Sequence, residues 1–189
     1  HFSFQGVNNP RGAGPTVRGV GTNNFSSAIE GSVGIVIDGV VIGRQGAGFT
    51  DLFDIQRIEV LRGPQGTLFG KNASAGVLSI VTADPKQDWE GRIQASYGSF
   101  DERILRASVT GGITSNLAMR LSGYVTKRDG YIENRFDSRR FNDRDEWGLR
   151  GKLRWDPADN VRVTLSGDYS RRDASCCIWT LRSLSLIHI

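Results

Sequence analysis

The sequence predicts a mainly β protein in which a small α+β domain is followed by an open antiparallel meander of strands. Short apolar runs separated by Gly, Pro and Asn occupy the first 85 residues, whereas from Trp89 onward apolar and polar residues alternate with a period of two. Glycine is abundant, with 24 residues in 189, which suits sheets joined by tight turns. No apolar run approaches the roughly 20 residues that a membrane helix needs.

The first elements are short and closely spaced. Residues 1–30 are rich in Gly, Asn, Pro and Ser and predict loops with brief strands, one of them at 16–18. Residues 33–42, with the sequence VGIVIDGVVI, predict a hairpin because the central Asp-Gly pair is favoured in type I′ turns. Thr50 is placed to cap a single helical turn.

The most regular unit of this first domain is residues 54–82, with the sequence DIQRIEVLRGPQGTLFGKNASAGVLSIVT. Residues 55–62 alternate and predict a strand, which Gly63 and Pro64 end because proline has no N–H for the sheet ladder. A tight glycine-rich return follows, and residues 76–82 predict a second, nearly continuous apolar strand. The unit contains no nucleophile–base pair and no cluster of metal ligands, so neither an enzyme nor a cofactor is expected.

Five amphipathic strands are predicted after Trp89, at 92–98, 105–110, 117–126, 147–155 and 161–169. Turns are expected at 111–116 and 156–160, and a long polar connection at 127–146. Trp147 and Trp155 stand at opposite ends of one apolar face, as the aromatic girdles of a membrane barrel do. The other face of that strand carries Arg150, Lys152 and Arg154, which are costly in a dry core and natural in a wet lumen. This pattern favours an apolar face that meets lipid.

Residues 54–82 resemble the plug motif of TonB-dependent outer-membrane receptors. Further pieces match in order: TVRGVG at 16–21, VIDGV at 36–40 and the barrel-like strands after Trp89, so that the resemblance covers residues 5–173. It implies an N-terminally truncated plug domain at 1–85, followed at 86–175 by an incomplete antiparallel transmembrane β-barrel meander. Residues 176–189, CCIWTLRSLSLIHI, fit neither pattern and are expected to be a non-native tail, with an atypical strand as the alternative.

The function that the resemblance implies is energised uptake of a scarce nutrient, foremost an iron-siderophore, across the outer membrane of a Gram-negative bacterium. The implied partners are outer-membrane lipid, the small-molecule ligand and the TonB energy-transducing complex, whose contact box the chain lacks. The residues that bind the ligand cannot be assigned from the sequence. Family arginines that pair the plug with barrel glutamates correspond to Arg18 and Arg62, and Arg57 and Glu59 join them as expected residues of plug–barrel ion pairing.

The alternative is a soluble β-rich binding module with a basic groove. A formal net charge of +4 is modest, and the bases are interspersed with acids, so nucleic acid is not an expected partner. Residues 66–72 fail as a phosphate loop because Asn72 stands where Ser or Thr must bind magnesium. The two histidines lie at the ends of the chain, and Cys176-Cys177 lacks the CxxC spacing, so no metal site is expected.

Overall fold

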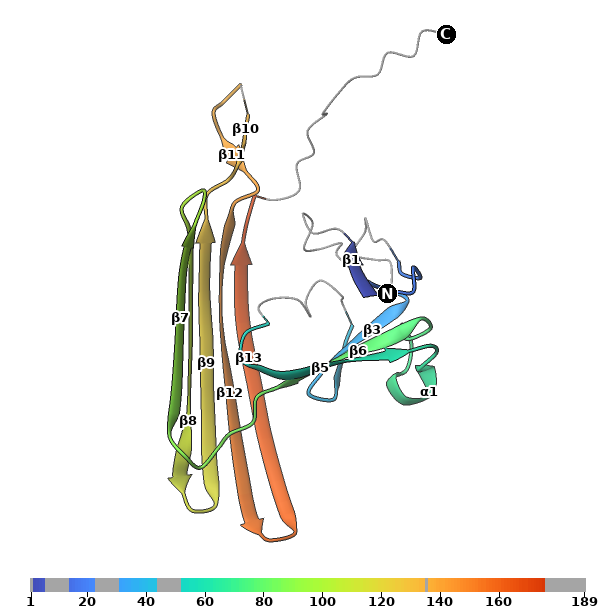
Figure 1. Cartoon of the computed structure of the whole chain (residues 1–189), viewed down its shortest axis with the longest axis vertical. Helices are drawn as coiled ribbons and strands as arrows, with labels where there is room; N and C mark the ends of the chain where they lie inside the picture. The colour runs from blue at the N-terminus through green and yellow to red at the C-terminus, as the bar shows by residue number, and fades with distance from the viewer. Residues whose placement is uncertain (1, 6–13, 23–30, 44–51, 135, 176–189) are drawn as a thin grey trace.

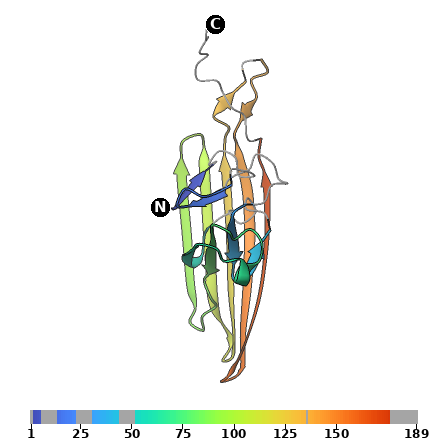
Figure 2. The ribbon, with the colours of Figure 1, turned by 90° about the vertical axis from the view of Figure 1, so that its right-hand side faces the viewer.

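The computed structural model describes residues 2–5, 14–22, 31–43, 52–134 and 136–175. In these ranges the strands form a four-stranded sheet, a five-stranded sheet and two sheets of two strands. We call the five-stranded sheet the large sheet, and the described residues up to Pro85 the small domain. The small domain lies against one face of the tall large sheet (Figure 1), and the view turned by 90° shows it in front of that face (Figure 2).

The small domain is built from short strands and one helical turn, which confirms the predicted α+β character. Its elements are β1 (Phe2–Gln5), β2 (Gly14–Val17), β3 (Val33–Ile37), β4 (Val40–Ile42), β5 (Ile55–Arg62), α1 (Gly66–Phe69) and β6 (Gly76–Thr82). The four-stranded sheet has the order β4-β3-β6-β5, in which β3 and β6 run parallel and the other pairs are antiparallel. The predicted hairpin turn is present, because both Asp38 and Gly39 have positive φ, as a type I′ turn requires.

The core of the small domain lies on the two central strands of its sheet. Ile35, Leu78 and Ile80 pack together as one cluster, and Val36, Ala73 and Val77 as another. Consecutive residues of a strand point to opposite faces, so β3 is covered on both sides. This explains why its sequence is a continuous apolar run, whereas the edge strand β5 alternates and is largely exposed.

The large sheet is an antiparallel meander of consecutive strands, as predicted. It contains β7 (Glu90–Gly98), β8 (Glu102–Thr114), β9 (Leu117–Arg128), β12 (Arg144–Ala158) and β13 (Val161–Asp173), in the order β13-β12-β9-β8-β7. In the described ranges no helix is long and apolar enough to cross a membrane.

The strands of the large sheet are longer than their alternation suggested, and the predicted turns are correspondingly shorter. Strand β8 extends to Thr114 and β12 to Ala158, so that two residues remain between the paired strands at each end. The pairing register shifts between Gly112 and Thr114 on β8, and again between Trp155 and Ala158 on β12. These irregularities allow the strands to contain the glycines and Pro157. The alternation stops at each irregularity although the pairing continues.

The long polar connection contains a small hairpin that projects past one end of the large sheet (Figure 1). Its strands are β10 (Ile132–Glu133) and β11 (Arg140–Phe141). Two predictions lie outside the described residues, namely the helix cap at Thr50 and the non-native character of the tail at 176–189.

Candidate functional site

The two faces of the large sheet have opposite character. The face turned away from the small domain is apolar and exposed, and includes Ile93, Leu105, Leu121, Val125, Trp147, Leu149, Leu153, Trp155, Leu165 and Tyr169. The inner face is polar, and its buried side chains include Ser108, Thr110, Ser122, Thr126, Glu146 and Lys152. A soluble sheet packed on a core would show the reverse. The alternative of a soluble module needs the apolar faces to pack on one another, and in the described part of the chain they do not.

Aromatic side chains border the apolar face at both ends. Trp147 and Tyr169 contact each other at one end, with ring centroids 5.4 Å apart. Trp155 marks the other end, eight residues along β12, which at about 3.3 Å per residue is about 26 Å along the strand. At the strand tilt of about 35–45° found in outer-membrane barrels, that length spans about 18–21 Å of height, which is most of the roughly 25 Å apolar band between their aromatic girdles.

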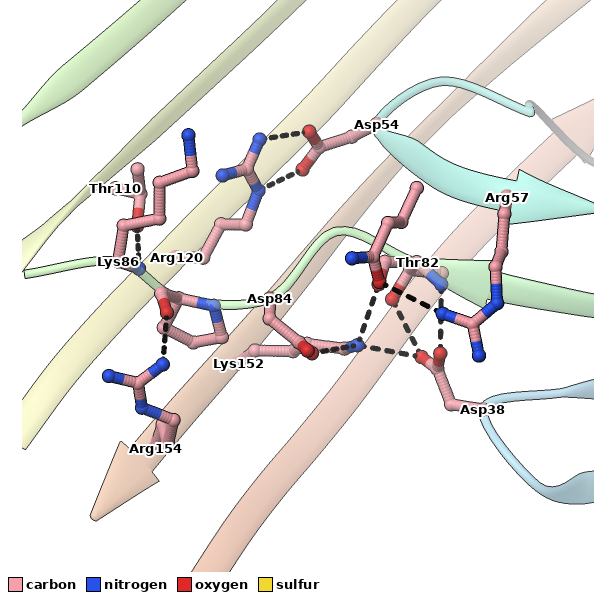
Figure 3. Close-up of polar contacts among 12 residues, drawn as sticks. Asp38, Asp54, Arg57, Thr82, Asp84, Lys86, Thr110, Arg120, Lys152 and Arg154 are labelled. Atoms are coloured by element: carbon pink, nitrogen blue, oxygen red, sulfur yellow. Dashed lines mark hydrogen bonds and ion pairs between the residues drawn. The ribbon is translucent and has the colours of Figure 1, made fainter. Parts of the chain in front are cut away.

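A buried ion pair joins the start of β5 to the inner face of the large sheet. Arg120 Nε donates to Asp54 Oδ2 at 2.7 Å, and a second guanidinium nitrogen bonds the other carboxylate oxygen (Figure 3). The side chains of Arg120 and Asp54 are only 14% and 7% exposed. Bidentate pairing of this kind fixes orientation as well as position.

Lys152 on β12 forms a second contact and reaches three groups of the small domain. Its Nζ lies 3.1 Å from Asp38 Oδ2 and 3.5 Å from Asp84 Oδ1, and it donates to the Thr82 carbonyl oxygen at 3.3 Å. The lysine side chain is 5% exposed. Asp38 is itself held in place, because it accepts bonds from the Thr82 amide at 2.8 Å and the Thr82 hydroxyl at 2.6 Å.

The connection between the two sheets is also attached to the inner face (Figure 3). The Lys86 amide donates to Thr110 Oγ1 at 2.9 Å, and Arg154 Nη1 donates to the Pro85 carbonyl oxygen at 3.0 Å. Thr110, Arg120 and Lys152 are direct cross-strand partners on β8, β9 and β12. Three of the attachments therefore lie on one line across the large sheet.

The arrangement is suited to reversible attachment. The small domain contributes carboxylates and backbone oxygens, while the large sheet contributes two arginines and a lysine. The described residues contain no group of three or more His, Cys, Asp or Glu that could hold a metal ion. When the plug moves, these ion pairs and hydrogen bonds can be replaced by hydrogen bonds to water, whereas a packed apolar interface has no such replacement.

Residues 2–77 match the family model described as the TonB-dependent Receptor Plug Domain. The small domain is a TonB-dependent receptor plug domain. The family expected from residues 54–82 is thereby confirmed, and the small domain is called the plug from here on.

Curated relatives of the chain include a protein named for the outer membrane. The chain is 40% identical over 81 residues to the iron-regulated outer membrane virulence protein of Vibrio cholerae, a match that covers 40% of the chain and 12% of that protein. It is 41% identical over 75 residues to the pesticin receptor of Yersinia pestis, covering 40% of the chain and 11% of that protein. The chain thus spans a small part of the length of the relatives it matches. An outer-membrane location agrees with these names and with the apolar outer face.

Solved structures extend the likeness to the large sheet. The ferric yersiniabactin uptake receptor FyuA from Yersinia pestis superposes with a TM-score of 0.76 at 26% identity, over 89% of the chain and 27% of that receptor. The pyoverdine receptor FpvA from Pseudomonas aeruginosa shares the fold, with a TM-score of 0.66 at 20% identity over 85% of the chain and 22% of that receptor. These matches confirm a plug followed by antiparallel barrel strands that do not close.

The residues predicted for plug–barrel ion pairing lie elsewhere on the plug. Arg57 Nε and Glu59 Oε1 pair with each other at 2.6 Å on the exposed side of β5. Arg18, in the turn after β2, and Arg62, at the end of β5, are exposed and form no ion pair with a described residue. Both lie outside the plug core, and the pairing expected for them stays a prediction.

Sequence reasoning missed the groups that link the plug to the large sheet. Lys152 was assigned to the wet face, but neither it nor Arg120 was given a partner. Asp38 was interpreted as a turn residue, and it occupies the turn while its carboxylate also binds Lys152. The available signal was the position of three aspartates just outside plug strands, with Asp38 after β3, Asp54 before β5 and Asp84 after β6.

The Asp38 carboxylate is expected to make the attachment sensitive to acid. Burial alone would raise its pKa, but hydrogen bonds from Thr82 and the charge of Lys152 together lower the pKa of Asp38 below its ordinary 3.8. Its contribution to stability is therefore complete above pH 3.8 and is lost as the pH falls through the lowered value. Urea unfolding at a series of pH values should show this loss for the native chain.

The Asp38→Asn variant is the control for this measurement. Its unfolding midpoint should be lower at neutral pH and should change less with pH in the acid range, because the titrating group is gone. A variant that keeps the full acid dependence of the native chain would contradict the assignment to Asp38.

Proposed function

We propose that residues 1–85 are the plug, and residues 86–175 the first barrel strands, of a receptor for energised uptake of an iron-siderophore. Two of the solved structures that share its fold are a ferric yersiniabactin uptake receptor and a receptor bound to pyoverdine. The partners in this proposal are the siderophore at the outer surface, the lipid of the outer membrane and the TonB complex on the periplasmic side.

The observation that carries the proposal is the row of charge pairs between the plug and the polar inner face of the large sheet. Asp54 with Arg120, and Asp38 and Asp84 with Lys152, hold the plug on the side of the sheet that faces away from lipid. A plug held this way closes the lumen at rest. Uptake then requires these pairs to break when the plug is pulled, and to re-form afterwards.

The four residues predicted from the family motif have a place in this mechanism. We propose that Arg18 and Arg62, both exposed on the plug, pair with carboxylates of barrel strands other than the five described here. Arg57 and Glu59 neutralise each other on β5, so that edge can meet the barrel lumen without adding net charge. The resting plug would then be held on several sides by ion pairs.

The experiment is uptake of radiolabelled iron by cells that produce the receptor containing this chain and lack their own siderophore receptors. Iron is supplied on hydroxamate, catecholate and mixed-ligand siderophores, with and without a functional TonB. We expect uptake of one class, abolished without TonB. No uptake of any class would refute the siderophore assignment, and TonB-independent uptake would refute energised transport.

Plug movement is tested in the same cells. The Asp38→Cys/Lys152→Cys pair, with Cys176 and Cys177 replaced by Ser, is joined by a reducible bifunctional thiol reagent. Uptake should stop on cross-linking and return after reduction, while siderophore binding to the cell surface persists. Each single cysteine variant is the matched control, and full uptake by the cross-linked receptor would show that this attachment need not break.

A further inference from the structure

The connection between β6 and β7 is bonded to the large sheet at successive residues. It leaves the plug, follows the large sheet and reaches the start of β7 at one end of that sheet (Figure 1). Beyond the contacts of Pro85 and Lys86, the Gln87 carbonyl oxygen accepts a hydrogen bond from the Gly112 amide at 2.9 Å. The Gln87 side-chain amide donates to the Ser115 carbonyl oxygen at 3.2 Å. Three consecutive residues of the connection are therefore held by strands of the large sheet or by the turn between β8 and β9.

Two adjacent glycines of β8 make room for the end of this connection. A Cβ atom on Gly111 would overlap the indole ring of Trp89. One on Gly112 would overlap the side chain of Gln87 and lie 3.2 Å from its carbonyl oxygen. Glycine weakens a strand, and inside a strand it often marks a place where another part of the chain approaches closely. The pair at 111–112 fits this description, because a larger residue would displace the ring or the amide.

Trp89 lies on the face of the large sheet that is turned away from the plug. It continues the alternation of β7 onto the apolar face, and its ring covers Gly111 on that same face. The ring is 65% exposed, at the end of the apolar face that Trp155 also occupies, where aromatic residues of membrane barrels meet the interface. Lys86, by contrast, is bonded to the inner face. The chain therefore passes from the lumen side to the lipid side between residues 86 and 89.

We propose that residues 86–89 are a fixed anchor for the plug, and that Trp89 is the residue that positions this anchor. The inference rests on the proposed function, in which the plug is pulled away from the inner face. Such a pull acts from the lumen side, whereas the indole lies on the lipid side. The anchor can follow the plug only if the ring leaves its apolar surroundings and passes round the end of the sheet, which is unfavourable. The moving unit therefore ends at Pro85, and the anchor keeps the displaced plug attached for its return.

Native-state hydrogen exchange of the full receptor in detergent, over a series of urea concentrations, tests where the moving unit ends. The amides of Asp38, which donates to the Ile80 carbonyl oxygen at 3.0 Å, and of Thr82 report on the plug. The amides of Lys86 and Gly112 report on the anchor. Amides of one cooperative unit open together. We expect the plug amides to exchange at lower urea concentrations than the anchor amides, which should open with β8 and β9. Exchange of Lys86 together with Thr82 would overturn the proposal.

Replacing Gly111 by Leu tests the role of the indole, because the new side chain displaces the Trp89 ring. The Lys86 amide should then exchange about tenfold faster and open with the plug amides, as expected when a large apolar contact is lost. Gly151→Leu is the matched control, since Gly151 also faces outward in a strand and a Cβ there would meet no atom within 4 Å. Trp89→Ala, which leaves β8 intact, should repeat the effect of Gly111→Leu. Native protection of Lys86 in Trp89→Ala would show that the ring does not position the anchor.

A cross-link across the anchor connects this result to transport. Gln87→Cys/Ser115→Cys, with Cys176 and Cys177 replaced by Ser, is joined by the reducible thiol reagent used for Asp38→Cys/Lys152→Cys. Uptake should continue after the first cross-link and stop after the second. Loss of uptake on joining positions 87 and 115 would show that the connection has to move. The hydrogen-exchange measurements need no transport, so they fail or succeed separately from the proposed function.

Discussion

Replacing Arg120 by Met is expected to lower the free energy of unfolding by about 3–5 kcal/mol, because it leaves a buried carboxylate without its partner. Asp54 is only 7% exposed and receives both of its bonds to the large sheet from that guanidinium. Urea titration of the receptor in detergent, followed by tryptophan fluorescence, measures the change. Removing both charges in Asp54→Leu/Arg120→Met should recover much of the loss, because no unpaired charge remains.

The matched control for Arg120 is Arg103 on β8, which pairs with Asp101 at 2.7 Å in an exposed setting. Their side chains are 68% and 40% exposed, so Arg103→Met should lower the free energy of unfolding far less than Arg120→Met. Equal losses at Arg103 and Arg120 would mean that the plug attachment contributes no more than a surface ion pair.

Replacing Leu121 by Arg is expected to destabilise the receptor by about 2–4 kcal/mol in lipid vesicles, the cost of a basic side chain at the middle of a bilayer. Leu121 lies on the apolar face of the large sheet. Its paired position on β12 is midway between Trp147 and Trp155. Reversible folding into phospholipid vesicles over a range of urea concentrations gives the free energy.

Ser166→Arg supplies the contrast for the lipid-facing position. Ser166 is exposed on β13 and is the cross-strand partner of Lys152, so it belongs to the polar inner face. An arginine there should change the folding free energy little, since its guanidinium reaches water. If Ser166→Arg cost as much as Leu121→Arg, the apolar face would not be the one in contact with lipid.

Local features of the fold were predictable because they depend on neighbouring residues. The hairpin at 33–42 follows from Asp38-Gly39, and strands 55–62 and 76–82 follow from alternation and from the Gly-Pro break. The order of the plug sheet was not predictable in the same way. Its parallel pairing of β3 with β6 depends on how separate apolar strands pack on each other.

The attachment of the plug could not be predicted for a related reason. Asp54 and Arg120 are 66 positions apart, and Lys152 lies 70 positions from Thr82. Their pairing depends on where the plug sits against the large sheet, which no local pattern specifies. Alternation did predict that Lys152 and Arg154 face a wet side, and the structure supplies the groups that they bind there.

The three attachments at Thr110, Arg120 and Lys152 also define a hinge. They lie on one line across β8, β9 and β12, where Arg120 and Lys152 hold the plug and Thr110 holds Lys86 of the connection that follows it, so the plug is held against sliding along the strands. Rotation about the line stretches these bonds least, and among the plug–sheet bonds described here the one from Arg154 to the Pro85 carbonyl lies off it and opposes such rotation. Under the proposed mechanism, a pull on the plug therefore begins as a tilt about this axis, with the lever arm set by the distance of the pulled segment from the line.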